Sequence, residues 1–554
     1  MTESPLVVEN LSFQYRSRPE LAIENISFEL EPGEMLLIAG SSGCGKTTLA
    51  RCINGLIPRS YGGKREGEVR LHGKDVAGIP LAEVAQIVGT LLQDPERQIV
   101  ASNVYNEIAF GPENLGLPRD EIVARVEMAM QRLGLGYLRE RDTFSLSGGE
   151  KQKVALAGVL AMNPSILLLD EPLASLDPAS AYEALGIFRG LADEGKTIVL
   201  IEHRVEDAIA ARPDRLMYMA DGRVEYLGPI TSLPQEIDHK QVKLPALWVV
   251  QRVKERKEIV ETVSKPEVRT ERSRSVPERG ETLVSFENVA FRYDTELPYV
   301  LQNVNLEIRR GDLIAVLGRN GAGKSTLIKH AIGLLKPTEG VVLVEGQDTR
   351  KMSVAQIARV LGFVFQSPTH MLYAPTVREE LAFGPNNLEF EKEEVTSAVS
   401  ESVATLNLSG LEEYPPLGLS FGQQKRTTIA AVLAMRSKIM VMDEPTAGQD
   451  YANYTHFMDV MCRPVDGAQS LLSANFAATL FITHDLDLAV TYANRVLLVG
   501  DGTVVADGTP EEVLKDFNLL ERCRVRRTSL LDLNLSLLPK TGGFLPAEAL
   551  AAYA

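Results

Sequence analysis

The sequence predicts an α/β protein in which one domain, built around a mainly parallel sheet, occurs twice in tandem. Three observations support this prediction. The chain of 554 residues is too long for a single core, its composition is that of a globular protein, and its second half repeats the motifs of its first half in the same order. Hydrophobic residues make up 45% of the chain and charged residues 24%, which excludes disordered and fibrous classes.

The repeat shows itself as a constant spacing between matching residues. Lys324 follows Lys46 by 278 residues, and Asp443 follows Asp170 by 273 residues. Tyr293 also follows Tyr15 by 278 residues, and Gln366 and Ser420 follow Gln93 and Ser147 by 273. A period of this length is far too long for a solenoid. The sequence therefore predicts a tandem duplication of a whole domain.

The boundaries of the two domains follow from a change in composition between the copies. Residues 251–280 are rich in charge, nearly free of aromatic residues and interrupted by Pro266 and Pro277, so they cannot bury enough apolar surface to fold alone. We expect a first domain at 1–250, a charged flexible linker at 251–280, and a second domain at 281–554 that ends in a partly amphipathic tail.

Composition and local patterns argue against several classes of protein. Four scattered cysteines fit neither a disulfide framework nor a zinc or iron–sulfur site, and a net charge of −16 argues against a surface built to coat nucleic acid. No apolar run approaches the roughly 18 to 20 residues of a membrane-spanning helix. The first residues do not resemble a signal peptide. We expect a cytoplasmic protein with no nucleic-acid partner.

A glycine loop follows a buried apolar run in each copy. The run MLLIAG (35–40) leads into GSSGCGKTT (40–48), and LIAVLG (313–318) leads into GRNGAGKST (318–326). Both loops fit GxxxxGK[ST], in which glycines let backbone N–H groups turn onto phosphate oxygens at a helix N-terminus. A chance glycine turn is the alternative, and two copies at matched positions argue against it.

This loop predicts the residues that would hold a nucleoside triphosphate and its Mg²⁺ ion. Lys46 and Lys324 would reach the β- and γ-phosphates, and Thr47 and Ser325 would ligate Mg²⁺. The predicted phosphate-binding residues are Gly40, Ser41, Gly43, Gly45, Lys46, Thr47 and Thr48 in the first copy, and Gly318, Asn320, Gly321, Gly323, Lys324, Ser325 and Thr326 in the second.

Two further apolar runs end in polar residues that suit hydrolysis. SILLLDEP (165–172) and KIMVMDEP (438–445) deliver Asp170 and Asp443 to the expected Mg²⁺ shell. The next residues, Glu171 and Glu444, would point elsewhere and could polarise the attacking water. A polar turn that merely caps the strand is the alternative.

A histidine ends a further apolar run in each copy, IVLIEH (198–203) and LFITHD (480–485). Such a histidine is often structural. Because His203 and His484 fall at the same sheet edge as the carboxylates in both copies, we expect each to contact the γ-phosphate.

Taken together, these motifs resemble the ATPase domain of ATP-binding cassette (ABC) proteins, and the resemblance covers nearly the whole chain. It implies two domains of the P-loop NTPase fold, each with a mainly parallel sheet core, an antiparallel β subdomain and a helical subdomain. It also implies that Tyr15 and Tyr293 stack on adenine, and that Gln93 and Gln366 touch Mg²⁺ or the attacking water.

The resemblance further identifies the signature motifs and the loops that join the two sites. The signature motifs are Ser147, Gly148 and Gly149 in the first copy, and Ser420, Phe421 and Gly422 in the second. The joining loops are ASLD (174–177) and AGQD (447–450), and Gln449 departs from the usual pattern where the first copy has Leu176.

In this family the signature motif of one domain completes the site of the other, so the resemblance implies that the two domains of this chain pair with each other. The first composite site would combine Lys46, Asp170, Glu171 and His203 with Ser420 and Gly422. The second would combine Lys324, Asp443, Glu444 and His484 with Ser147, Gly148 and Gly149. ATP would hold the halves together and its hydrolysis would release them.

The segments after the two glutamines resemble the ATPases of energy-coupling factor (ECF) importers. Both contain Ala-Phe-Gly-Pro, and Phe110 and Phe383 each lie 17 residues after Gln93 and Gln366. The resemblance implies docking onto a transmembrane coupling subunit, a membrane substrate-binding subunit as second partner, and uptake of a vitamin, a vitamin precursor, or cobalt or nickel ions. It places the chain peripherally on the cytoplasmic side of the membrane. The alternative for the two phenylalanines is local core of a helical subdomain.

Two other functions fit twin ATPase copies. One is the ATPase of a sugar-type ABC importer, whose second copy often has degraded catalytic residues, whereas Glu444 and His484 are intact here. The other is a soluble ABC translation factor acting on ribosomes, which carries a long charged helical arm between its copies. The prolines of the short linker disfavour such an arm.

Phe421 stands where the first copy has Gly148. A signature motif at a helix start offers a serine hydroxyl and backbone N–H groups, and phenylalanine keeps its backbone donor. We expect Phe421 to project away from the nucleotide and the site built on Lys46 to stay active. The alternative is a degenerate, mostly structural site.

Overall fold

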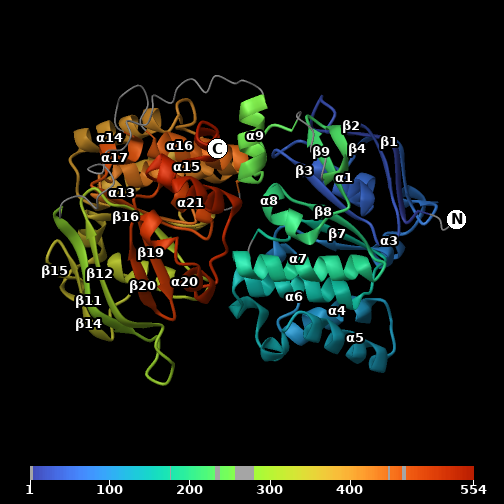
Figure 1. The fold of residues 1–554 in the computed structure, drawn as a ribbon, viewed down its shortest axis with the longest axis horizontal. Helices are drawn as coiled ribbons and strands as arrows, with labels where there is room; N and C mark the ends of the chain where they lie inside the picture. Colours follow the sequence, from blue (N-terminus) through green and yellow to red (C-terminus); the bar gives the residue numbers. More distant parts are fainter. Residues whose placement is uncertain (1–3, 175, 231–236, 256–279, 447–448, 464–469) are drawn as a thin grey trace. The chain divides into compact units, whose positions relative to one another are not determined.

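The computed structural model describes residues 4–174, 176–230, 237–255, 280–446, 449–463 and 470–554. It divides into two compact units, Met1–Leu244 with Asp450–Ala452, and Pro245–Gln449 with Asn453–Ala554. Figure 1 colours the chain from blue in the first unit to red in the second. Most of the expected linker, 256–279, lies outside the described residues, as do positions 175, 447 and 448 of the two joining loops.

The first unit is built around a six-stranded sheet whose inner strands are parallel. Its strands, in spatial order, are β10 (Arg223–Pro229), β9 (Arg215–Ala220), β3 (Met35–Gly40), β8 (Thr197–Ile201), β7 (Ile166–Asp170) and β6 (Val88–Leu91). Every residue of β3, β7 and β8 is buried. Strands covered on both faces need unbroken apolar runs, which is why these segments read as continuous runs in the sequence.

A second sheet in this unit is antiparallel, in the order β2, β1, β4, β5. Its strands are β1 (Leu6–Tyr15), β2 (Ile23–Leu30), β4 (Gly63–Leu71) and β5 (Lys74–Asp75). Residues of β2 alternate between buried and exposed, as expected for a sheet with one face on a core. The core cluster of this unit joins the buried face of this sheet to α1 and to one face of the parallel sheet.

The helices of the first unit fall into two groups. Beside the sheets lie α1 (Lys46–Ile53), α2 (Leu56–Arg59), α3 (Leu81–Ile87), α7 (Pro178–Asp193) and α8 (Val205–Ala208), with 3₁₀ turns η1 (Val76–Gly78), η2 (Pro95–Arg97) and η5 (Ile209–Ala211). A helical subdomain contains α4 (Val104–Asn114), α5 (Arg119–Arg132) and α6 (Gly148–Ala161), with η3 (Gly136–Leu138) and η4 (Thr143–Ser145). These three helices pack on one another (Figure 1).

The second unit repeats this architecture. Its parallel-core sheet has the order β16 (Leu361–Val364), β17 (Ile439–Asp443), β18 (Ala478–Ile482), β13 (Leu313–Leu317), β19 (Arg495–Gly500) and β20 (Thr503–Gly508). Its antiparallel sheet has the order β12 (Leu301–Arg309), β11 (Thr282–Phe291), β14 (Glu339–Val344) and β15 (Gln347–Asp348). The core again joins the two sheets through the helix that follows the glycine loop.

Most helices of the second unit have a counterpart at the same place in the first. They are α11 (Lys324–Ala331), α12 (Val354–Ala358), α13 (Val377–Asn387), α14 (Lys392–Thr405), α15 (Phe421–Ala434), α16 (Tyr451–Cys462), α17 (Leu471–Asn475), α18 (Leu486–Tyr492) and α19 (Pro510–Val513), with η7 (Thr349–Lys351), η8 (Pro368–His370) and η9 (Pro416–Gly418). The expected fold, two α/β domains with antiparallel and helical subdomains, is confirmed.

The tail of the second unit forms α20 (Phe517–Arg522), α21 (Ser529–Thr541) and α22 (Ala547–Leu550). Helix α21 packs on α18, and both α21 and α22 pack on α9 (Ala246–Glu255), which precedes the expected linker. Ser529 Oγ, at the start of α21, accepts a hydrogen bond from the backbone N–H of Ala246 at 2.7 Å. The first unit thus ends at Leu244, and the boundary expected near residue 250 falls inside α9, whose apolar face packs on the tail.

No helix among the described residues is long and apolar enough to cross a membrane.

Candidate functional site

Four neighbouring strands of each parallel core end at the same edge of the sheet, and each carries one of the expected site residues. In the first unit the order β3, β8, β7, β6 brings together the loops after Gly40, Ile201, Asp170 and Leu91. The second unit repeats this edge with β13, β18, β17 and β16. The edge of a parallel sheet where the strands end is the usual ligand site of such folds.

The glycines of the two loops adopt backbone conformations that other residues rarely adopt. The φ angles of Gly40, Gly43 and Gly45 are +152°, +80° and +105°, and the matching glycines of the second loop have nearly the same values. A Cβ at Gly40 would lie 2.2 Å from the carbonyl oxygen of Met219. At Gly43 a Cβ would meet nothing within 4 Å. The first loop glycine therefore permits close packing on β9, while the central one lies in open space.

The lysine of each loop is folded back on its own backbone. Lys46 Nζ donates hydrogen bonds to the carbonyl oxygens of Gly40 and Ser41, both at 2.8 Å, and Lys324 Nζ donates to those of Gly318 and Arg319 at 2.7 and 2.9 Å. Both lysines are buried. The ammonium groups are thus held over the loops where phosphate oxygens would replace the carbonyls as acceptors.

Asp170 and Asp443 stand at the ends of β7 and β17, opposite the loop hydroxyls. Ser325 Oγ donates to Asp443 Oδ2 at 3.5 Å. Burial, followed by the charge of the adjacent Glu171, raises the pKa of Asp170 to about 6, and burial with Glu444 does the same for Asp443. Such crowded carboxylates are relieved by a bound cation, and hydroxyl and carboxylate oxygens are the ligands that Mg²⁺ prefers. The residues present therefore fit an Mg²⁺ ion.

Glu171 and Glu444 have left-handed backbones, with φ of +50° and +46°. The backbone N–H of Glu171 donates a hydrogen bond to the carbonyl oxygen of Ile201 at 3.0 Å, and that of Glu444 donates to the carbonyl oxygen of Ile482 at 2.9 Å. Each bond joins the glutamate to the last residue of the neighbouring strand and holds its unfavourable backbone conformation. A left-handed residue directly after the strand turns the glutamate side chain away from the direction of the preceding aspartate. This explains how consecutive carboxylates can take two roles, as the sequence predicts.

The side chains around the two glutamates differ. Gln93 Nε2 donates to Glu171 Oε2 at 2.7 Å, whereas His203 Nδ1 lies 3.7 Å from the same oxygen. In the second unit His484 Nδ1 lies 2.9 Å from Glu444 Oε1.

Burial raises the pKa of the Glu171 carboxyl. The contact with His203 and the charges of His203, Lys46 and Arg204 outweigh that effect, so the net pKa is lowered. Glu171 is therefore held as a carboxylate, the form that accepts a hydrogen bond from water.

The two tyrosines expected to stack on adenine are tied to the glycine-loop helices. Tyr15, at the end of β1, hydrogen-bonds Thr48 Oγ1 at 3.1 Å, and Tyr293 hydrogen-bonds Thr326 Oγ1 at 3.4 Å. Phe13 packs edge-to-face against the Tyr15 ring with centroids 4.8 Å apart. Tyr293 is 57% exposed. The structure thus holds each ring beside the phosphate loop, with Tyr293 exposed and Tyr15 partly buried against the core of the first unit.

The signature motifs begin α6 and α15. Ser147 and Ser420 cap these helices in capping boxes with Glu150 and Gln423, and all the motif residues are at least partly exposed. Gly422 has no positive φ, and a Cβ there would meet nothing within 4 Å. The helix itself does not require a glycine at that position. Phe421 is 40% exposed.

Within each unit, the structure places the loop lysine, the loop hydroxyls, the aspartate, the glutamate, the glutamine, the histidine and the tyrosine around the ends of neighbouring strands. The signature motifs belong to the helical subdomains, and in the described residues their capping bonds run within their own helices.

Sequence reasoning missed Lys425. It is 1% exposed, and its ammonium donates to the backbone carbonyls of Phe365 and Gln366. A residue-by-residue alignment of the two signature helices would have flagged it, because the first copy has Gln152 there.

A GxxxxGK[ST] loop with left-handed glycines, an aspartate near its hydroxyl and a glutamate directly after that aspartate, all at one edge of a parallel sheet, are the features of a P-loop ATPase. The family model described as "ABC transporter" matches residues 23–174 and 301–447, one segment in each unit. An ABC transporter ATP-binding protein of Caldanaerobacter subterraneus subsp. tengcongensis is 34% identical over 96% of both chains. One of Bacillus cereus is 35% identical over 95% of this chain and 94% of its own.

Among solved structures, cbiO1 from Clostridium perfringens, described as part of the ABC transporter complex cbiONQ, is 28% identical. It covers 47% of this chain and 98% of its own, with a TM-score of 0.39.

The chain belongs to the ABC transporter family, with two ATP-binding domains fused in one polypeptide. It is an ATPase and the ATP-binding subunit of an ABC transporter.

Proposed function

We propose that the chain is the ATPase subunit of an ECF-type importer and powers uptake of a vitamin, a vitamin precursor, or cobalt or nickel ions. Its partners would be a transmembrane coupling subunit and a membrane substrate-binding subunit, so that the chain lies peripherally on the cytoplasmic face of the membrane. The observation that carries this proposal is a pair of exposed phenylalanines at the same position of the two units.

Phe110 on α4 and Phe383 on α13 are 48% and 50% exposed. Their neighbours explain this exposure. A Cβ at Gly111 would lie 2.7 Å from Met162 Cγ, and one at Gly384 would lie 2.5 Å from Met435 Cγ, so the glycine side of each helix packs against the signature helix. The preceding phenylalanine faces another direction. The alternative considered from the sequence was that these rings belong to the local core of the helical subdomain. Rings that are half exposed do not fit that alternative.

The second unit adds a further aromatic ring to this surface. Tyr373, which is 59% exposed, packs edge-to-face on Phe383 with centroids 4.8 Å apart, and Val100, 61% exposed, occupies the matching position in the first unit. Exposed apolar groups that recur at matched positions of two domains are typical of a protein-binding surface. They suit apolar helices of a coupling subunit.

The site residues would divide the work of ATP hydrolysis as follows. Tyr15 and Tyr293 would hold adenine, and Lys46 and Lys324 would neutralise phosphate charge. A bound Mg²⁺ would supply further charge neutralisation between the β- and γ-phosphates.

The glutamates would act on the attacking water. Glu171 and Glu444 would each accept a hydrogen bond from it, while Gln93 and Gln366 help to position it. His203 and His484 would contact the γ-phosphate.

Each site would be completed by the signature motif of the other domain, which the family resemblance implies. Ser420 and Gly422 would serve the site of Lys46, and Ser147, Gly148 and Gly149 would serve the site of Lys324. The exposed helix starts of α6 and α15 support this arrangement, because they offer free backbone N–H groups to a γ-phosphate.

The test is co-purification of the full chain with its membrane partners after co-expression. We expect Phe110→Ala together with Phe383→Ala to reduce recovery of the small membrane subunits at least fivefold, with ATP binding unchanged. Met128→Ala serves as the control, since Met128 is 65% exposed on α5, outside the proposed surface. The ECF proposal fails if the double variant and the unaltered chain recover the same amount of the membrane subunits. It also fails if the unaltered chain co-purifies with ribosomes or with a sugar permease pair.

A further inference from the structure

Lys425 is among the largest fully buried side chains of the protein and lies in the fifth position of the signature helix α15. Its ammonium donates hydrogen bonds to the carbonyl oxygens of Phe365 at 3.3 Å and Gln366 at 3.1 Å. These residues directly follow β16, and Gln366 is the glutamine assigned to the attacking water. A buried charge is costly unless it is paired, and here two backbone dipoles supply part of that pairing.

The same ammonium also feels the carboxylates of the candidate site. Strand β16 runs parallel to β17, with Val364 opposite Met442, so the chain after β16 emerges next to Asp443 and Glu444. Burial lowers the pKa of Lys425 to about 8, and the negative charges of Asp443 and Glu444 oppose that shift. Lys425 therefore links the signature helix, the backbone of the glutamine loop and the acidic end of β17.

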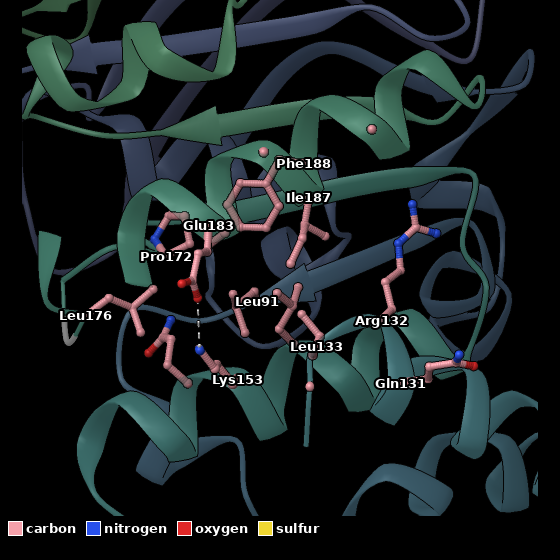
Figure 2. A pocket seen from close by; sticks show the side chains of 16 residues that line it. Leu91, Gln131, Arg132, Leu133, Lys153, Pro172, Leu176, Glu183, Ile187 and Phe188 are labelled. Carbon is pink, nitrogen blue, oxygen red and sulfur yellow. Dashed lines mark ion pairs between the residues drawn. The ribbon is translucent and has the colours of Figure 1, made fainter. Parts of the chain in front are cut away.

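The first unit is built differently at the same position. Gln152, the fifth residue of α6, is 2% exposed, and neither of its amide atoms has a hydrogen-bond partner among the described residues. It lies in the lining of a cavity of about 570 Å³ between the helical subdomain and α7. Figure 2 shows this cavity, with the ion pair of Lys153 and Glu183 marked by a dashed line.

The glutamine loops differ in a matching way. In the first unit the Gln93 side chain is engaged by Glu171, at 2.7 Å. In the second unit the hydrogen bond of Glu444 is made with His484, at 2.9 Å, and the loop is held through the backbone carbonyl of Gln366. Because the Gln366 backbone is fixed, the Gln366 side chain can turn toward a ligand from a fixed position.

We propose that Lys425 is a positioning residue for ATP hydrolysis in the second unit, which fixes the backbone of Gln366 and so makes the two ATP sites of this chain chemically unequal. The inference rests on the role that the proposed function gives to Gln366. Lys425 acts through Gln366 rather than on the nucleotide, so its loss lowers the rate of hydrolysis and leaves ATP affinity nearly unchanged.

The experiment is a double-mutant cycle of Lys425→Met and Gln366→Ala in the full chain, with kcat and KM for ATP as readouts. It is run in the unaltered chain and in the Glu171→Gln chain. If the two ATP sites hydrolyse independently, the effect of Lys425→Met on kcat is visible in the Glu171→Gln chain, where only the second site turns over. If the two sites are coupled, the effect is visible in the unaltered chain. Lys425→Gln repeats the test with the residue that the first unit carries at this position, in case Lys425→Met does not fold.

We expect Lys425→Met to lower kcat at least fivefold in one of the two backgrounds while KM changes less than twofold. The Lys425→Met, Gln366→Ala chain should then be within twofold of Gln366→Ala alone, because both substitutions remove the same contribution. Gln152→Met is the matched control and should change kcat less than twofold, since the Gln152 amide makes no hydrogen bond within the described residues.

The possible failures are distinguishable. If Gln366→Ala keeps the unaltered kcat in both backgrounds, the role of Gln366 under the proposed function is wrong, and this inference falls with it. If Gln366→Ala lowers kcat but the two substitutions multiply, or if Lys425→Met stays within twofold in both backgrounds, the role of Lys425 is wrong and that of Gln366 stands.

Discussion

Replacing Asp170 by asparagine should make the nucleotide-free protein more stable, although it removes a predicted Mg²⁺ ligand. Asp170 is 8% exposed, and burial beside Glu171 raises its pKa from 3.8 to about 6. A carboxyl whose pKa is higher in the folded state binds its proton more tightly there. Stability therefore falls as the pH rises from 3.8 through 6, and the whole penalty is present above that window.

The magnitude follows from the pKa. A pKa change of one corresponds to 1.36 kcal/mol, so the rise to about 6 corresponds to roughly 3 kcal/mol of destabilisation at pH 8. Asparagine has nearly the same shape and carries no charge. We expect Asp170→Asn to recover about half of this penalty. Each 1 kcal/mol recovered should raise the melting temperature of a domain of this size by roughly 2 to 4 °C.

The assay is thermal unfolding of the full chain with EDTA at pH 8 and at pH 5. The gain of Asp170→Asn should be present at pH 8 and should shrink at pH 5, where Asp170 in the folded protein is largely protonated. Asp120→Asn, at an exposed position of α5, is the control and should shift the transition by less than about 1 °C. An Asp170→Asn chain that melts at or below the unaltered chain at pH 8 refutes the reasoning.

Three further outcomes follow from the two sites. Replacing Glu171 and Glu444 together by glutamine should lower steady-state ATPase about 10²- to 10⁴-fold while ATP binding by calorimetry persists, and turnover near the unaltered rate would contradict the assignment. Phe421→Gly should change the ATPase rate less than about tenfold, which is under roughly 1.4 kcal/mol in the activation barrier. If a Glu444→Gln chain shows no turnover and Phe421→Gly restores it, the site built on Lys46 is degenerate. Tyr15→Ala and Tyr293→Ala should each weaken ATP binding about two- to tenfold with pyrophosphate binding unchanged, since stacking contributes about 0.5 to 1.5 kcal/mol.

The sequence by itself determined the duplication and the order of strand, glycine loop and helix, and it placed acidic residues at the ends of buried strands. These features are local. A glycine loop such as 40–48 needs its glycines for positive φ wherever it occurs, and a strand covered on both faces, such as β7, must be apolar along its whole length.

Only the tertiary structure decided how those local pieces are held. The order of strands in the sheet decides which loops lie next to each other at its edge. No local sequence pattern encodes that order. Lys425 reaches the carbonyl of Gln366, 59 residues away, because α15 packs against β16. Likewise, α9 joins the second unit through α21 and α22, which are distant in sequence. Buried polar groups find their partners across such distances, so their roles become visible only once the chain is folded.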